Sequence, residues 1–137
     1  MIAQIATGIM SKYTGSALAS SLTGGLWRDE AKQGVVFPYG VFHIIDVLGN
    51  DTFTEKCEFA RIQFDLWSKY SASVSDARAT LDTLESALRT LYDWTTLTIS
   101  GWSNAGMRFI SSRPAFSEDE NVVGVIIEYE TYISKSR

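Results

Sequence analysis

Residues 101–106, with the sequence GWSNAG, come nearest to a catalytic motif in this chain. A nucleophile elbow has the pattern G-x-S-x-G and leads from a strand into a helix, which holds the serine on a strained turn. Here Ala105 stands where the second glycine would be, and a strand pattern follows. We therefore interpret the segment as a turn. A small serine hydrolase using Ser103 and His43 is the enzymatic alternative.

His43 is the single histidine and Cys57 the single cysteine of the chain. A general base needs a partner and access to a cleft, whereas His43 alternates with apolar residues, which favours a core histidine with a satisfied hydrogen bond. Cys57 has no histidine or basic cluster near it in the sequence, so we expect a plain thiol without an intrachain disulfide or a zinc site. Neither residue predicts a catalytic, cofactor or metal site.

Acidic residues occur in two settings. Four of them fall largely on the polar face of a predicted helix, where solvated charge is expected and metal binding is not: Asp76, Asp82, Glu85 and Asp93. Glu118, Asp119 and Glu120 stand in a row, and three adjacent like charges repel one another. Either this loop serves solubility, or it forms a negatively charged lumen or rim that faces DNA or a basic partner.

The composition limits the class of protein. With 137 residues the chain fits a single domain, residues 1–137, which can fold without a metal or a disulfide. Twelve basic against sixteen acidic residues give a net charge of -4, and the basic residues are scattered, so we expect no tight grip on DNA. No apolar run has transmembrane length and no basic residue precedes the N-terminal apolar stretch, so we expect no membrane association and no signal peptide. A reducing cytoplasm suits the single cysteine.

Two adjacent segments have the clearest structural pattern. Residues 53–68 are predicted to form a strand, because their polar and apolar side chains alternate. One face of this strand is apolar: Ala60, Ile62, Phe64 and Leu66. The other face is mixed: Arg61, Gln63, Asp65 and Trp67. An amphipathic helix is predicted next, at about residues 74–92, with Ser73 or Ser75 as its N-cap. Its apolar stripe consists of Ala77, Leu81, Leu84, Leu88 and Leu91.

The remaining elements follow from periodicity and turn residues. In the first half of the chain we expect an N-terminal helix at residues 2–12, with a possible extension to residue 22, an exposed polar excursion at 26–34 and a strand buried on both faces at 35–47. In the second half we expect a short β-prone run at 95–100, a strand at 107–112 ended by Pro114, an acidic loop at 117–121 and a strand at 122–133. The fold class is α+β. It is a mainly antiparallel sheet of four to five strands with the N-terminal helix and the long central helix packed on it.

The order of these features resembles the tail completion, or tail terminator, family of long-tailed bacteriophages. The resemblance rests on a strand that starts with Pro38-Tyr39, on a strand that ends in Asp65-Leu66-Trp67-Ser68, on the Ala- and Leu-rich helix after it, and on the acidic loop before a β-rich C-terminus. It extends over residues 22–133. The acidic loop reads SEDEN here, where relatives often show Asp-Pro-Asp-Gly.

The resemblance implies a virion structural protein, not an enzyme, with no cofactor. Such proteins form a ring, usually a hexamer, at the head-proximal end of the tail tube, where the ring stops tube polymerisation and offers a docking surface to the head. The implied partners are other copies of the chain, the tail tube protein and the head–tail connector proteins, while DNA passes through without specific binding. The implied location is the head–tail junction of the virion, after assembly in the host cytoplasm. A neck or head-completion protein below the portal is the structural alternative.

A ring of identical subunits requires two different patches that meet head to tail. We predict one patch on the mixed strand face, with Phe59, Arg61, Asp65 and Trp67. We predict the other in the polar excursion, with Trp27, Arg28 and Asp29. The alternative for Trp67 is simple packing under the first helix, since tryptophan is highly buried on average.

Overall fold

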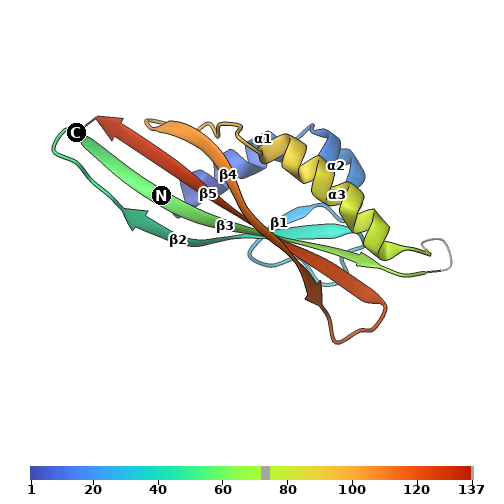
Figure 1. Cartoon of the computed structure of the whole chain (residues 1–137). Helices are drawn as coiled ribbons and strands as arrows, with labels where there is room; N and C mark the ends of the chain where they lie inside the picture. Colours follow the sequence, from blue (N-terminus) through green and yellow to red (C-terminus); the bar gives the residue numbers. More distant parts are fainter. Residues whose placement is uncertain (72–74, 137) are drawn as a thin grey trace.

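Five strands and three helices make up the part of the chain that the structure describes. The computed structural model describes residues 1–71 and 75–136, and Figure 1 shows the helices gathered on one side of a twisted sheet. In chain order the elements are α1 (Ile2–Tyr13), α2 (Ala17–Ser21), β1 (Leu26–Arg28), β2 (Tyr39–Gly49), β3 (Glu55–Lys69), α3 (Ala77–Tyr92), β4 (Ser103–Phe116) and β5 (Val122–Ser136). The strand order is β1-β2-β3-β5-β4, with β1 parallel to β2 and the other neighbours antiparallel. The predicted α+β class is confirmed.

The central strand β3 sorts its side chains by the predicted alternation. Ala60, Ile62, Phe64 and Leu66 are all fully buried beneath the helices. β3 pairs with β5 without interruption from Glu55 opposite Ser136 to Lys69 opposite Val122, so the alternation of one strand is copied onto the other. The apolar face of this pair is what α3 packs on.

An aromatic group lies between the sheet and the helices. The ring centroid of Phe64 lies 5.0 Å from that of Tyr92 in α3 and 5.8 Å from that of Tyr129 in β5. The Tyr92 hydroxyl donates to the carbonyl oxygen of Ile9 at 2.9 Å and so ties α3 to α1. Burial raises the pKa of Tyr92, which keeps this donor protonated.

Helix α3 begins later than predicted and has a different cap. Asp76 is the N-cap, since its carboxylate accepts from the backbone N–H of Ala79 at 2.9 Å. A carboxylate both accepts from the free N–H groups and interacts favourably with the helix dipole. Ser75 is therefore not the cap, and Ser73 lies outside the described residues. The predicted stripe is buried except for Leu91, which is partly buried next to the fully buried Tyr92.

The N-terminal third differs from the prediction in three places. The first helix ends at Tyr13, and a new helix starts after Gly15, which has a φ of 77°, and Ser16, whose side chain caps α2. The polar excursion begins as a strand, because Leu26 is buried at the position opposite Gly40. The strand predicted at 35–47 starts only at Tyr39, and it is not buried on both faces, since its later part is partly exposed.

The C-terminal third also differs. Residues 95–100 form no strand among the described elements; their Leu97 and Ile99 are buried against the core as an irregular segment. The predicted turn at 101–106 is largely strand, because the Asn104 side chain accepts from Leu97 N–H and donates to Thr131 Oγ1 across a bulge. Strand β4 continues through Pro114, which an edge strand tolerates because its outer side needs no ladder donor. The acidic loop at 117–121 is confirmed.

Gly124 on β5 is closely packed against Trp67 on β3, and this contact provides a test of the fold. A Cβ at Gly124 would lie 2.6 Å from two ring carbons of Trp67, whereas a Cβ at Gly49 would meet nothing within 4 Å. We expect Gly124→Ala to lower the free energy of unfolding by about 1–3 kcal/mol, because the indole has to move. Gly49→Ala should stay within about 0.5 kcal/mol of wild type. Urea unfolding followed by tryptophan fluorescence measures both, and equal stability of the two variants would contradict this packing.

Candidate assembly surface

The sheet has an open face, defined here as the face that points away from the helices. Side chains that lie opposite one another on neighbouring strands share a face. On β3 the open face consists of the mixed set predicted from the sequence, Phe59, Arg61, Gln63, Asp65 and Trp67 with their cross-strand neighbours. The structure therefore places the first predicted patch together, along the central strand.

Charged side chains cross the open face in a line. Asp46 on β2 lies opposite Arg61 on β3, Arg61 lies opposite Glu130 on β5, and Glu130 lies opposite Arg108 on β4. Arg61 binds Asp46 at 2.8 Å and Arg108 binds Glu130 at 3.2 Å, so signs alternate across four strands. We call these four residues the charge ladder.

Within the charge ladder, the Asp46–Arg61 pair favours the ionised form of both partners. The hydrogen bond from Arg61 lowers the pKa of Asp46, and the same bond raises the pKa of Arg61. Beside the ladder, Arg113 on β4 binds Glu128 on β5 at 3.0 Å. Glu128 and Glu130 alternate with apolar residues in the sequence, but the arginines that pair with them depend on strand register, which periodicity alone does not give.

His43 joins the two predicted patches. Its Nδ1 lies 3.6 Å from Asp29 and its Nε2 lies 3.3 Å from Asp65, which also accepts from the Gln63 amide at 2.8 Å. The expectation of a core histidine was wrong, because the side chain is 34% exposed on the open face. The segment of Asp29 and the strand of Asp65 thus form one continuous surface, not two separate patches.

The two tryptophans of the predicted patches are partly buried on this surface. Trp67 does not pack under the first helix, because its ring lies against Gly124 on the face opposite the helices. Trp27 donates from Nε1 to the Gly24 carbonyl at 2.8 Å, and the Lys32 ammonium lies 5.7 Å from its ring centroid. Arg28 instead points to the helix side of the sheet edge, where it lines a shallow groove with α1.

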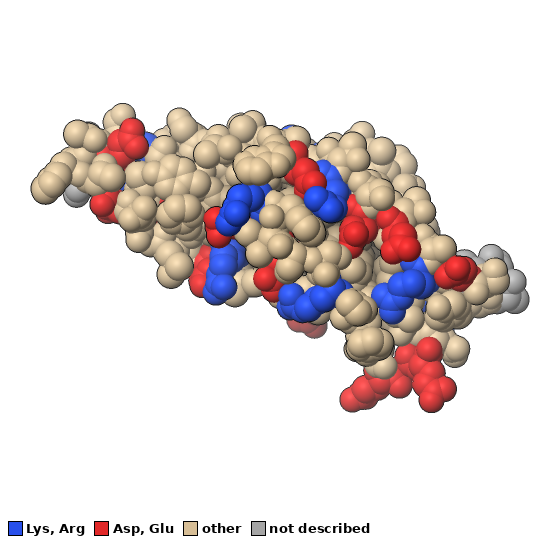
Figure 2. Space-filling view, in the orientation of Figure 1, with Lys and Arg blue, Asp and Glu red and all other residues tan. Residues whose placement is uncertain are grey.

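The acidic loop projects from the sheet at the β4–β5 turn. Figure 2 shows it as a group of acidic side chains extending beyond the body of the molecule. Glu118, Asp119 and Glu120 are exposed, Lys69 approaches Asp119 only to 3.9 Å, and Phe116 beside them is 82% exposed. Without these three carboxylates the chain would hold thirteen acidic and twelve basic residues, so most of its net charge lies here.

The residues of the hydrolase alternative are far apart. Ser103 pairs with Ser134 on β5, while His43 pairs with Gln63, whose other partner is Glu128 on β5. Six residues of β5 separate those two positions, which is about 20 Å along an extended strand. A nucleophile and its base must lie within hydrogen-bond reach, so this pair does not form a catalytic site.

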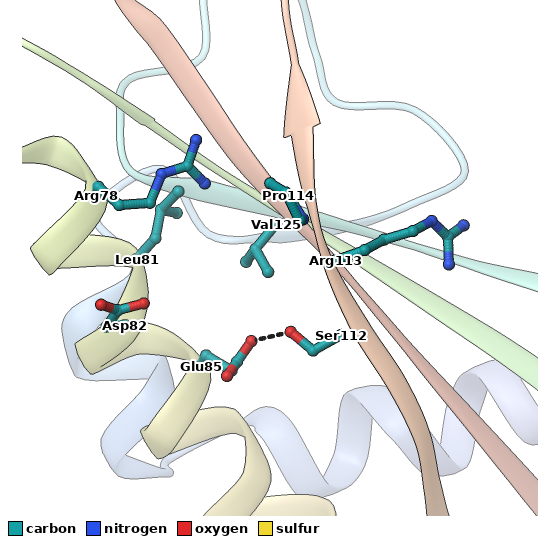
Figure 3. A pocket seen from close by; sticks show the side chains of 8 residues that line it. All are labelled: Arg78, Leu81, Asp82, Glu85, Ser112, Arg113, Pro114 and Val125. Atoms are coloured by element: carbon teal, nitrogen blue, oxygen red, sulfur yellow. Dashed lines mark hydrogen bonds between the residues drawn. The ribbon is translucent and has the colours of Figure 1, made fainter.

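The best-defined hollow lies between α3 and β4 and has a volume of about 420 Å³. Figure 3 shows Leu81 and Val125 at its centre, with the Ser112 hydroxyl bonded to the Glu85 carboxylate across it and Arg113 pointing away. Arg78 is engaged with the Gly124 carbonyl at 2.8 Å. The eight lining residues include neither histidine nor cysteine, and we assign the hollow no chemistry.

The described residues contain no cluster that suits a metal ion. Within residues 1–71 and 75–136, no three His, Cys, Asp or Glu side chains are grouped so as to hold one. No helix in that part of the chain is both long and apolar enough to cross a bilayer.

Comparison with known proteins identifies the family of the chain. The sequence matches the family described as "Tail completion protein gp17" over residues 13–134, which is most of the chain. The chain belongs to this family. The predicted resemblance is thereby confirmed, and the tail completion family consists of structural proteins of the phage tail. No curated protein matches the sequence.

Solved structures confirm the fold of this tail completion protein. One is a chain of the "Virion of native gene transfer agent (GTA) particle", with a TM-score of 0.69 and 14% identity, covering 92% of this chain and 91% of its own. Another has a TM-score of 0.61 and 12% identity, covering 95% of this chain and 93% of its own. At such identities the likeness concerns the fold alone.

The charge ladder of the tail completion protein predicts a specific pH dependence. Because the folded-state pKa of Asp46 is lowered, its stabilising contribution is present above its unfolded value of about 3.9 and is lost as the pH falls through the lower folded value. We expect Asp46→Asn to be less stable than wild type at pH 6 and to approach it at pH 3. Urea unfolding at several pH values measures the difference, with Glu118→Gln in the exposed loop as control. A constant difference from pH 6 to pH 3 would contradict the assignment.

Proposed function

We propose that this phage tail protein forms a closed ring of identical subunits on the head-proximal end of the tail tube. The ring stops tube polymerisation and provides the surface to which the head connector binds, and DNA passes through its central hole. The family supports the role in tail completion, and a protein of the same fold occurs in a gene transfer agent virion. The single observation that carries the proposal is the open face, which combines partly exposed aromatic side chains with charges that are paired across the strands.

The chemistry of the open face suits contact with protein. Aromatic residues and arginine are enriched in protein interfaces. Here the ring centroids of Phe59 and Tyr132 lie 4.9 Å apart, next to the charge ladder. Most of the charges are already paired within the subunit, so covering the face leaves few carboxylates or guanidiniums unpaired. An unpaired buried charge is the main cost of a polar interface, and the ladder avoids it.

The acidic loop suits a surface that DNA passes without binding. In a ring, the loop of each subunit occupies an equivalent position, so Glu118, Asp119 and Glu120 would repeat around the central hole or at its rim. Like charges on loop and phosphate keep DNA from adhering, because binding depends on basic residues that replace counterions. The exposure of the loop, with Lys69 near Asp119 alone among its three carboxylates, supports this placement.

A ring has a mass that distinguishes it from a monomer. Light scattering during size exclusion, with purified tail tubes added where needed, should give about six times the 15.2 kDa monomer mass or show capped tube ends by negative-stain imaging. A strict monomer that caps no tubes would contradict the proposal. An antibody to the protein should label one end of the free tails that a head-defective mutant makes. Free tails without the protein would indicate a neck protein.

The predicted patch can be tested by single substitutions. We expect Trp27→Asp to weaken assembly at least tenfold, because it places a charge in the continuous surface around His43 without removing a core side chain. Trp67→Ala should have a similar effect on assembly. Phe53→Asp is the matched control, since Phe53 is fully exposed on a hairpin tip away from the patch. Unchanged assembly and folding in both tryptophan variants would show that the interface lies elsewhere.

A further inference from the structure

A cyclic ring needs a second patch that the sequence did not provide. The two predicted patches form one surface through His43, and a head-to-tail contact joins two different surfaces. The complementary patch must therefore lie elsewhere on the subunit. This inference rests on the proposed ring and asks which residue of the subunit meets the open face of its neighbour.

Trp94 has two properties that folding does not explain. The residue is 72% exposed, although tryptophan has the largest side chain of any residue type. Its φ is 57°, in the left-handed region, at the position just after α3 where glycine or asparagine is usual. A bulky residue with positive φ is an outlier, and a polar residue would suit the exposure better.

The backbone holds Trp94 in this conformation. Its N–H donates to the Met107 carbonyl at 2.7 Å, and the Met107 N–H donates to the Thr95 carbonyl at 3.0 Å. Just before it, Asp93 accepts from Arg89 at 3.0 Å and from the Tyr129 hydroxyl. The backbone from which the indole extends is thus fixed, and a fixed backbone lowers the entropy that is lost on binding.

We propose that Trp94 anchors the second patch and packs on the open face of a neighbouring copy of this chain, near Trp27 and His43. The bonds to Met107 place Trp94 on the outer side of β4, and β1 is the opposite edge of the sheet. Patches on opposite edges are the arrangement that repeats around a ring, whereas a single edge joined to itself gives a closed dimer.

The charges around the two patches are complementary. From the start of α3 to the end of β4 the chain carries four arginines against three carboxylates, Asp82, Glu85 and Asp93, and Figure 2 shows basic side chains over this region, interleaved with acidic ones. The chain from β1 to the end of β2 has three carboxylates, Asp29, Glu30 and Asp46, against two basic side chains, Arg28 and Lys32. Opposite net charges bring the two edges together and disfavour contact between like edges.

Trp94→Gly separates binding from folding. Glycine removes the indole and suits the left-handed conformation, so the melting temperature should be equal to or higher than that of wild type. Self-association, or the completion of tails in an extract from a phage lacking this gene, should fall at least tenfold. Phe53→Gly removes an aromatic side chain that is even more exposed, at another place in the fold, and should leave assembly unchanged. Normal assembly of a folded Trp94→Gly protein would overturn the inference while leaving the ring intact.

Cross-linking identifies the surface that Trp94 meets. A chain with Lys32→Cys beside Trp27 and Thr96→Cys beside Trp94 keeps both indoles, and both positions are exposed. Under the same assembly conditions it should form a ladder of covalent oligomers on oxidation, while each single variant should form none. Dimers from Thr96→Cys alone would mean that the edge of Trp94 meets itself and would overturn the head-to-tail contact. If wild type neither associates nor completes tails, the proposed ring itself is wrong.

Discussion

The uninterrupted pairing of β3 with β5 is the constraint on which the rest of the structure depends. Fifteen residues of each strand face one another from Glu55 opposite Ser136 to Lys69 opposite Val122. Because side chains alternate along a strand, a shift of one residue would move every apolar side chain to solvent. The register therefore puts Phe64 and Tyr129 under the helices, and it puts Arg61 and Glu130 opposite each other on the open face. Core and assembly surface have one common origin.

Charges on the open face are paired within the subunit, so this face can be exposed to water and could also be covered by another protein. Exposed ion pairs contribute little to stability, so the charge ladder adds only modestly to folding. In the proposed ring it would act mainly on specificity, because a neighbour that fails to match alternating signs meets like charges. The edges of the sheet are unsuited to strand addition. β4 has two bulges and Pro114, and β1 has only three residues. Contacts between copies in the proposed ring would therefore use side chains.

Periodicity and turn residues predicted those elements that depend on residues close together in the sequence. The alternation of β3, the stripe of α3 and the acidic loop all follow from residues near one another in the sequence. Three features depend on distant partners and were missed. β1 is a strand because Leu26 fits beside the side-chain-free Gly40, β4 starts early because Asn104 bonds across a bulge, and the two patches merge because His43 reaches both carboxylates. Periodicity carries no information about such pairings.

Trp94 shows where reasoning from the sequence ends. A tryptophan after a helix looks like an ordinary core residue, and only the backbone angle and the exposure reveal that it is neither buried nor relaxed. Strain of this kind persists when surrounding bonds enforce it, here through Met107, and it is concentrated at sites of function. The patch around Trp27 and His43 lies toward β1 and Trp94 lies beside β4, so the proposed contact would give each copy a donor and an acceptor side. Subunits joined in this way would add in one direction, and such a chain of contacts ends only when a ring closes.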